Sequence, residues 1–287
     1  MLTSKSATSP GSNFNRQGGS IFNRRRQTVF ANHKGGVGKS STAVQFAYYL
    51  ALIAKKRVLI LDLDHQLNTT NAVTKSNKAA VSQTTTFAIL QDGATSIDDA
   101  PFVLVPGARS LIKLEVQGKQ QHNVFASNLL DFLDAVSDQF DACIIDTNGN
   151  PDIRLTAALV AADFVVSPIQ LNQEAIDGIG DLLSDIKRVK QINKKLQLIG
   201  ILPNMVEAKP FQKANFEQII THYPSLLIMT APGSNEFAHI PMRSVIPEAQ
   251  AEGVPIWEIK KTAARDAWRD LERYFKVIAN RIGLEIE

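Results

Sequence analysis

Short apolar runs rich in Val, Ile and Leu alternate with helix-period segments from residue 28 to the end of the chain. Parallel strands that are buried on both faces have such continuous apolar runs, and the helices between them connect neighbouring strands. The pattern therefore predicts an α/β fold, a mostly parallel twisted β-sheet with helices on both faces. The predicted strands are 28–31, 57–61, 102–105, 142–146, 164–168, 196–202 and 226–229. The predicted helices are 40–54, 123–139, 154–161, 175–191, 211–222 and 262–282.

Length and composition narrow the class of protein. The chain has 287 residues, a formal charge of +3 and 44% hydrophobic residues. This is the composition of a soluble globular protein, and it excludes a collagen-like or largely disordered chain. We expect a single domain over 27–287, although the length also allows two. The apolar run 46–54 is far shorter than the roughly 18 residues of a membrane span, and no secretory signal is visible, so we expect a cytoplasmic protein.

The basic charge is concentrated at the start of the chain. Residues 1–27 hold five basic residues and no acid, so the other 260 residues sum to −2. Segment 1–26 is rich in Ser, Asn, Gly and Arg and cannot bury enough apolar surface to offset its ordering entropy, so we predict a disordered tail. The one cysteine, Cys143, excludes a disulfide framework and a multi-cysteine metal site, and we interpret it as a small buried residue.

A glycine-rich loop, K-G-G-V-G-K-S, links the first predicted strand to the first predicted helix. Glycines let backbone N–H groups converge on phosphate oxygens, and the helix N-terminus adds positive potential. Lys39 would neutralise the β- and γ-phosphates, and Ser40 would give its hydroxyl to Mg²⁺. The sequence thus predicts a nucleotide site. Its residues are Lys34, Gly35, Gly36, Val37, Gly38, Lys39, Ser40 and Ser41.

Carboxylates end two further predicted strands. Asp62 and Asp64 follow one strand at positions i and i+2, so they share a face beside the loop. Asp146 ends strand 142–146 in the Walker B pattern, in which an aspartate holds Mg²⁺ through a water molecule. We therefore predict a magnesium site at Ser40 and Asp146, with Asp62 contributing more weakly through water. The alternative is that Asp62 and Asp64 cap the next segment.

Together these motifs resemble the ParA/Soj partition ATPases, the deviant-Walker-A branch of P-loop NTPases that includes MinD. The resemblance covers nearly everything from Thr28 to the C-terminus. It implies that ATP and Mg²⁺ are the cofactors and that ATP joins two subunits face to face. In the family the entrance lysine, here Lys34, reaches the partner's ATP, and the second aspartate, here Asp64, orients the attacking water.

The chain departs from the family pattern near both acidic motifs. His65 and Leu67 stand where the family usually has Pro and Gly, and Asn148 lies where prolines usually follow the Walker B strand. Asn204 and Pro241 fall where relatives border the adenine, which implies contact with the base. Asn204 could instead turn the chain after a strand.

Basic residues gather over 187–213 and again over 260–281. Family members bind DNA without sequence preference through this part of the fold. The resemblance implies that Lys209 contacts DNA, and we predict that Lys213 and Arg243 do so too. The alternative is that each of these side chains is a solvated surface charge.

The last predicted helix has apolar residues at spacings of three and four. They are Ala264, Trp268, Leu271, Phe275, Ile278 and Ile282. A MinD-like protein would lay such a helix on a membrane, but Glu285 and Glu287 at the end of the chain oppose anionic lipid. We interpret the stripe as core packing and expect no membrane partner.

The resemblance implies an ATP-dependent switch that segregates plasmid or chromosome DNA. The ATP-bound homodimer would coat non-specific DNA in the nucleoid, and a ParB-type or other cargo adaptor would stimulate hydrolysis and release it. Three alternatives stay open. They are positioning of a protein cargo such as a chemoreceptor cluster, a MinD-like membrane-bound regulator, and a ligase-type metabolic enzyme, for which we see no substrate-pocket residues.

Overall fold

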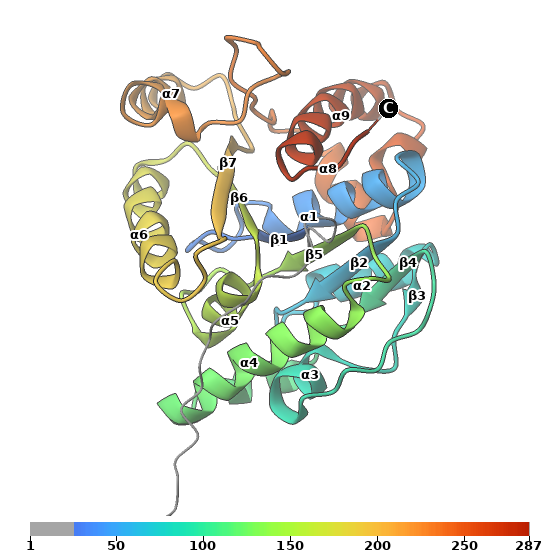
Figure 1. Ribbon diagram of the computed structural model, residues 1–287. Coiled ribbons are helices and arrows are strands. Elements are labelled where there is room, and N and C mark those ends of the chain that lie inside the picture. The colour runs from blue at the N-terminus through green and yellow to red at the C-terminus, as the bar shows by residue number, and fades with distance from the viewer. Residues whose placement is uncertain (1–25, 287) are drawn as a thin grey trace, which may run out of the picture.

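The computed structural model describes residues 26–286 (Figure 1). The prediction of a disordered tail over 1–26 therefore lies outside the described residues, except for Arg26. Seven parallel strands form one sheet in the order β3-β4-β2-β5-β1-β6-β7. The strands are β1 (Gln27–Phe30), β2 (Val58–Asp62), β3 (Ala80–Val81), β4 (Phe102–Val105), β5 (Ala142–Asp146), β6 (Phe164–Ile169) and β7 (Gln197–Pro203).

Helices cover both faces of this sheet, as the sequence predicts (Figure 1). The helices are α1 (Lys39–Tyr48), which continues as a π-helical turn (Tyr49–Ile53), α2 (Asn68–Ser76), α3 (Thr86–Asp92), α4 (Lys119–Val136), α5 (Ile153–Ala161), α6 (Gln173–Val189), α7 (Pro210–His222), α8 (Val245–Glu252) and α9 (Thr262–Arg281). Short 3₁₀ segments lie at Arg109–Leu114, Pro224–Leu226 and Ile256–Glu258.

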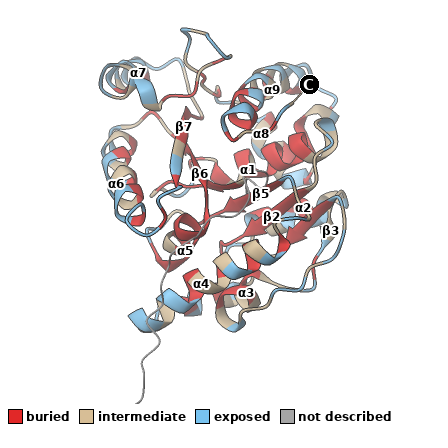
Figure 2. Cartoon of the chain, in the orientation of Figure 1, coloured by how far each residue is buried: buried red, intermediate tan, exposed pale blue. Residues whose placement is uncertain are grey.

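Two apolar clusters, one on each face, hold the layers together. Successive residues of a strand point to opposite faces, so Ile60 packs with α1, α8 and α9, whereas Leu59 and Leu61 pack with α4 and α5. The residues of the sheet and of the inner sides of the helices are accordingly buried (Figure 2). Burial on both faces explains why the strands are nearly continuous apolar runs.

The apolar stripe of α9 is confirmed as core packing. Leu271, Phe275 and Ile278 are buried against α1, and the partly buried Trp268 lies with its ring centroid 4.4 Å from that of Trp257. Among residues 26–286, no helix combines the length and the apolar character needed to cross a membrane.

Some predicted elements are wrong or missing. Segment 226–229 is not a strand: it forms only isolated bridges, from Leu227 to Ile201 and from Met229 to Phe237. Its apolar side chains are buried under a loop, which a periodicity argument cannot distinguish from a short strand. Helices α2, α3 and α8 and the two-residue β3 were not predicted, because they are short and bury few apolar residues.

Candidate nucleotide site

The glycine-rich loop runs from the carboxyl end of β1 to the first turn of α1, as predicted. Gly36 and Gly38 have φ angles of 73° and 85°, a region that L side chains rarely adopt. Gly38 also lies against Asn204, since a Cβ on Gly38 would stand 2.1 Å from the Asn204 Nδ2 atom. Gly35 and Gly36 are exposed, whereas Val37 is buried. The backbone of the two glycines is therefore accessible to a ligand, and the Val37 side chain packs in the core.

Lys39 occupies the centre of the loop. Its side chain is 5% exposed, and its Nζ donates a hydrogen bond to the Lys34 carbonyl oxygen at 2.5 Å. Burial lowers the pKa of Lys39, and the nearby charges of Asp146 and Asp64 oppose that shift. The loop thus holds a desolvated ammonium group at the position where phosphate oxygens would lie.

Asp62 and Asp146 lie side by side at the carboxyl edge of the sheet, in register on β2 and β5, and both are fully buried. Burial, and then the charge of Asp62, raise the pKa of Asp146 to about 7, although the Thr69 and Ser40 hydroxyls and the Lys39 charge lower it. Burial likewise raises the pKa of Asp62 to about 6. Two neighbouring buried carboxylates favour a cation between them and the phosphates.

Of the two carboxylates, Asp146 is the one with an oxygen that accepts no hydrogen bond within residues 26–286. Its Oδ2 accepts a hydrogen bond from the Thr69 hydroxyl at 2.7 Å, whereas its buried Oδ1 has no partner among the described residues. A hard oxygen donor of this kind, beside the hydroxyl of Ser40, fits Mg²⁺. In residues 26–286, no group of three or more His, Cys, Asp or Glu could hold a metal ion by itself.

The Asp62 carboxylate, unlike that of Asp146, has hydrogen-bond partners on both oxygens. Its Oδ2 accepts from the Thr70 backbone N–H at 2.8 Å and from the Thr70 hydroxyl at 2.7 Å, and its Oδ1 accepts from the Asp64 N–H at 2.9 Å. Asp62 therefore caps the first turn of α2, which is the capping role that the alternative interpretation gave it. Its weak contribution to a magnesium site stays a prediction.

Asp64 begins the loop between β2 and α2. It is 6% exposed, and its Oδ1 accepts from the Gln66 N–H at 3.0 Å. Leu67, where the family usually has Gly, adopts a left-handed conformation with φ of 64°. The loop therefore keeps the backbone turn that favours glycine, without a glycine.

Asn204 and Pro241 lie on neighbouring segments, because Val206 forms a β-bridge with Pro241. Both ends of the Asn204 amide are engaged: Nδ2 donates to the Val37 carbonyl at 2.8 Å, and Oδ1 accepts from the Met205 N–H at 2.9 Å. Asn204 thus braces the phosphate loop. Contact of Asn204 or Pro241 with adenine stays a prediction.

Lys34 forms an ion pair with Glu174, at the start of α6. The Glu174 side chain is 75% exposed. The hydrogen bond from Lys34, and then its charge, hold the pKa of Glu174 below its usual range. The entrance lysine is therefore held by a partner at the surface of its own subunit.

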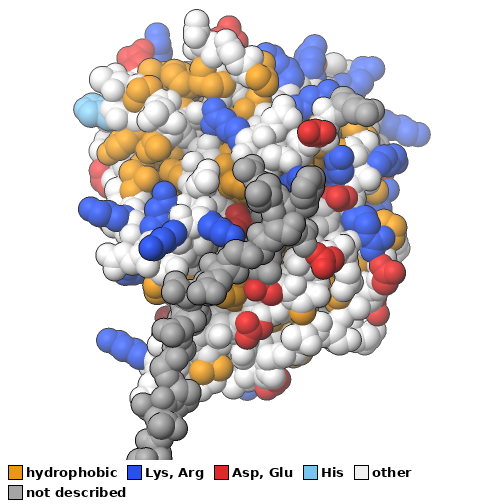
Figure 3. Space-filling model, viewed as in Figure 1, with side chains coloured by type: hydrophobic (Ala, Val, Ile, Leu, Met, Phe, Trp, Pro, Cys, Tyr) orange, Lys and Arg blue, Asp and Glu red, His pale blue; other side chains and the backbone are white. Residues whose placement is uncertain are grey.

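The predicted DNA contacts are at the surface, but two of them are paired. Lys209, which precedes α7, lies 2.8 Å from Glu207, and Arg243 lies 3.4 Å from Asp270 and is only partly exposed. Lys213 is exposed on α7. Figure 3 shows many Lys and Arg side chains over the α9 part of this face and larger apolar patches toward α7.

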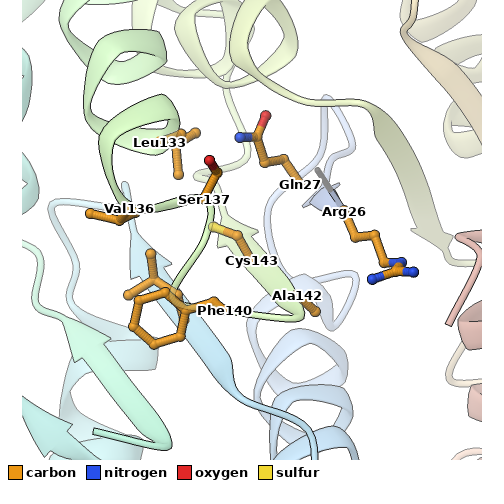
Figure 4. Close-up of a pocket in the computed structure, with 9 residues that line it drawn as sticks. Arg26, Gln27, Leu133, Val136, Ser137, Phe140, Ala142 and Cys143 are labelled. Atoms are coloured by element: carbon orange, nitrogen blue, oxygen red, sulfur yellow. The ribbon is translucent and has the colours of Figure 1, made fainter. Parts of the chain in front are cut away.

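Cys143 lies near the amino end of β5, the central strand of the sheet (Figure 4). It borders a hollow of about 20 Å³ that is lined by Leu133, Val136 and Phe140 among others. Such a hollow holds at most a single water molecule. Burial raises the pKa of the Cys143 thiol, so the prediction of a small buried residue is confirmed.

The parallel sheet, the loop after β1 and the buried aspartates that end β2 and β5 define a P-loop nucleotide-binding protein. A family model described as "AAA domain" matches residues 25–198. Protein IncC of Escherichia coli is 34% identical to this chain over 85% of the chain's residues. The matched part covers 66% of the length of IncC. The chromosome-partitioning ATPase Soj of Thermus thermophilus is 30% identical over 71% of this chain and 80% of its own length.

The chain belongs to the ParA/Soj family of partition ATPases. Its fold agrees with that of a solved ATP complex of Cyanothece McdA, with a TM-score of 0.73, 18% sequence identity, and coverage of 92% of this chain and 98% of the other. At this identity the likeness shows the fold alone.

Proposed function

We propose that this protein is an ATP-dependent partition switch that segregates plasmid or chromosome DNA. The observation that carries the proposal is the carboxyl edge of the sheet, where the buried Lys39 lies near Asp146, whose Oδ1 has no hydrogen-bond partner within residues 26–286. Partition ATPases among the relatives support the biological role.

In this proposal the phosphate loop from Lys34 to Ser41 binds ATP through backbone N–H groups, and Lys39 neutralises the β- and γ-phosphates. Ser40 and Asp146 hold Mg²⁺, Asp146 through water, and the ion supplies charge neutralisation at the phosphates when bound. Asp64 orients the attacking water. Intrinsic hydrolysis is slow, since water positioning is the main contribution of this chain's own residues.

Lys34 acts across a dimer interface. The exposed ion pair with Glu174 contributes little to stability, so it can be exchanged for contact with the partner's nucleotide. The ATP-bound homodimer binds DNA without sequence preference through Lys209, Lys213 and Arg243, and a ParB-type or other adaptor stimulates hydrolysis. The single domain over 27–287 and a cytoplasmic, nucleoid-associated location belong to the same proposal.

Two variants test the assignment. Asp64→Ala should bind ATP and dimerise but hydrolyse poorly, because the water loses its orienting carboxylate. Lys34→Ala should bind ATP as a monomer and fail to dimerise. The matched variant Glu174→Gln keeps Lys34 and removes only its charged partner, so it should still dimerise.

Gel filtration with a slowly hydrolysed ATP analogue, together with phosphate release, measures both effects. Wild-type turnover in Asp64→Ala would mean that another residue orients the water. A Lys34→Ala protein that still shifts to the dimer would refute the role of Lys34 in trans.

A further inference from the structure

A buried ion pair lies just behind the candidate site, at the start of α5. Arg154 is 3% exposed and Asp152 is 9% exposed. The Arg154 Nε donates to the Asp152 Oδ2 at 3.0 Å, and its Nη2 contacts the same oxygen. Asp152 also caps α5, because its Oδ1 accepts from the Arg154 N–H at 2.9 Å. Burying an ion pair is a poor way to stabilise a fold, so the pair calls for a role beyond stability.

The free end of the guanidinium reaches the loop after β2. The Arg154 Nη1 lies 2.9 Å from the His65 Nδ1. A guanidinium can only donate, so the His65 Nδ1 accepts this hydrogen bond. The same Nδ1 lies 3.3 Å from the Asp64 Oδ1. Because Nδ1 accepts from Arg154, its approach to a second acceptor is not a hydrogen bond, and Arg154 instead holds the His65 ring and with it the loop that carries Asp64.

Few other contacts hold this carboxylate in place. Within residues 26–286, the remaining hydrogen bonds that involve Asp64 are local: from its own N–H to Asp62, from the Gln66 N–H to its Oδ1, and from the Leu67 N–H to its carbonyl oxygen. The contact from Arg154 to His65 therefore joins the Asp64 loop to a part of the chain 89 residues away.

The other arm of the network reaches the phosphate loop. The Asn148 Nδ2 donates to the Asp152 Oδ2 at 2.5 Å, and Asn148 is 3% exposed. The next residue, Gly149, packs on the phosphate loop so closely that a Cβ there would stand 2.4 Å from the Gly35 N atom. A continuous set of contacts thus runs from Gly35 through Asn148, Asp152, Arg154 and His65 to Asp64.

We propose that Arg154 is a positioning residue for ATP hydrolysis, which anchors the His65 ring and thereby fixes the loop that places the Asp64 carboxylate at the attacking water. Asp152 and Asn148 set the position of Arg154 relative to the phosphate loop. In this proposal the phosphate loop and the loop between β2 and α2 therefore keep a fixed distance from each other. Arg154 itself does not contact the nucleotide, because its guanidinium is buried and engaged with Asp152 and His65. This inference rests on the proposed role of Asp64.

The first test uses variants of His65, which leave the buried pair of Arg154 and Asp152 intact. His65→Ala removes the ring, and kcat should fall by about 10- to 100-fold, the usual cost of misplacing a reacting group. KM for ATP and dimerisation with a slowly hydrolysed analogue should stay near wild type. His65→Asn, which can present its Oδ1 to Arg154 in place of Nδ1, should restore most of kcat. The matched control is His222→Ala, which removes an exposed histidine at the end of α7.

The second test is a double-mutant cycle between His65 and Arg154. Arg154→Met should lower kcat about as much as His65→Ala, and the two changes together should lower it no further. Arg154→Lys should recover part of kcat, since it keeps the charge. Because Arg154→Met leaves Asp152 unpaired and could fail to fold, the His65 series decides the matter by itself.

Asp64→Ala, measured in the same series, separates the two levels of the argument. A fast Asp64→Ala protein would overturn the proposed function. A slow Asp64→Ala protein beside a His65→Ala protein with wild-type kcat would overturn only the role of Arg154 and His65. A His65→Asn protein as slow as His65→Ala would likewise contradict positioning by the Arg154 contact.

Discussion

Two regions of this protein differ in how far their charged side chains are buried. One is the carboxyl edge of the sheet with the phosphate loop, called the edge below. The other is the surface that bears Lys209, Lys213 and Arg243, called the surface below. At the edge, Lys39, Asp62 and Asp146 are buried, and the Asp146 Oδ1 has no hydrogen-bond partner in the part of the chain that the structure describes. On the surface, Lys209 and Arg243 are at least partly exposed, and each lies beside an acid of its own chain. Buried charge is costly unless a ligand compensates it, whereas exposed ion pairs contribute little. The edge is therefore specialised for one ligand, and the surface can exchange its partners.

The largest effect is expected at the edge. Lys39→Ala should abolish ATP binding, because the phosphate loop loses the cation that neutralises the β- and γ-phosphates. Isothermal titration with ATP and Mg²⁺ measures this. Lys213→Ala, on the exposed face of α7, is the surface counterpart and should bind ATP as the wild type does. Similar ATP affinity in Lys39→Ala and Lys213→Ala would contradict the role of the edge as the nucleotide site.

The second effect is a dependence of stability on pH at the same edge. The pKa of Asp146 is raised to about 7, so the protonated form is favoured in the folded, nucleotide-free protein. Its contribution to stability is complete below the unfolded pKa, near 4, and is lost as the pH rises through 7. Asp146→Asn should therefore unfold at a higher temperature than wild type at pH 8 and lose most of that advantage at pH 4.

Thermal unfolding without nucleotide, at pH 4, 6 and 8, checks this prediction. Cys143→Ser is a suitable control, because it changes a buried polar atom on the same strand away from the carboxylates. An advantage of Asp146→Asn that does not grow with pH would show that folding does not raise the pKa of Asp146.

The surface gives the next effect. Lys209→Glu should weaken DNA binding equally for all sequences and spare dimerisation, because a phosphate contact carries no sequence information. Each phosphate contact adds about 0.9 to the slope of log affinity against log salt, so losing one contact per subunit should lower the dimer's slope by about 2. Electrophoretic shifts at several salt concentrations measure it. An unchanged slope would remove Lys209 from the DNA surface.

The smallest effect concerns Leu67, which holds a left-handed turn at the edge. Leu67→Gly and Leu67→Ala remove the same side-chain contacts, but only glycine relieves the backbone strain. The glycine variant should therefore be more stable than the alanine variant by about 1 kcal/mol. Urea unfolding of the two proteins gives the difference. Equal stability would mean that residue 67 leaves the left-handed region when its side chain is removed.

The same contrast explains what the sequence could predict. The long apolar runs predicted six of the seven strands. The phosphate loop, Asp62, Asp64 and Asp146 were predicted to lie near one another, because the carboxyl ends of parallel strands meet at one edge of the sheet. These features depend on local pattern and on sheet topology. The capping by Asp62 was weighed as an alternative, since a carboxylate before a helix can serve either role.

The rest depends on contacts between distant side chains. Neither the pairing of Lys34 with Glu174 nor the contact of Arg154 with His65 leaves a local signal, because the partners are 140 and 89 residues apart. Asn204 was predicted at the adenine, and only the fold shows that its amide braces Val37. For surface lysines such as Lys209, the sequence gives charge but not the neighbouring acid.

The central claim is that ATP at the buried edge controls DNA binding at the exposed surface. Co-sedimentation with plain duplex DNA, with ATP and with ADP, tests it most directly, and anionic liposomes under the same conditions separate DNA from membrane. We predict strong, salt-sensitive, sequence-independent DNA binding with ATP and weak binding with ADP, because pairing two subunits doubles the phosphate contacts. Equal DNA affinity in the two nucleotide states would contradict the switch.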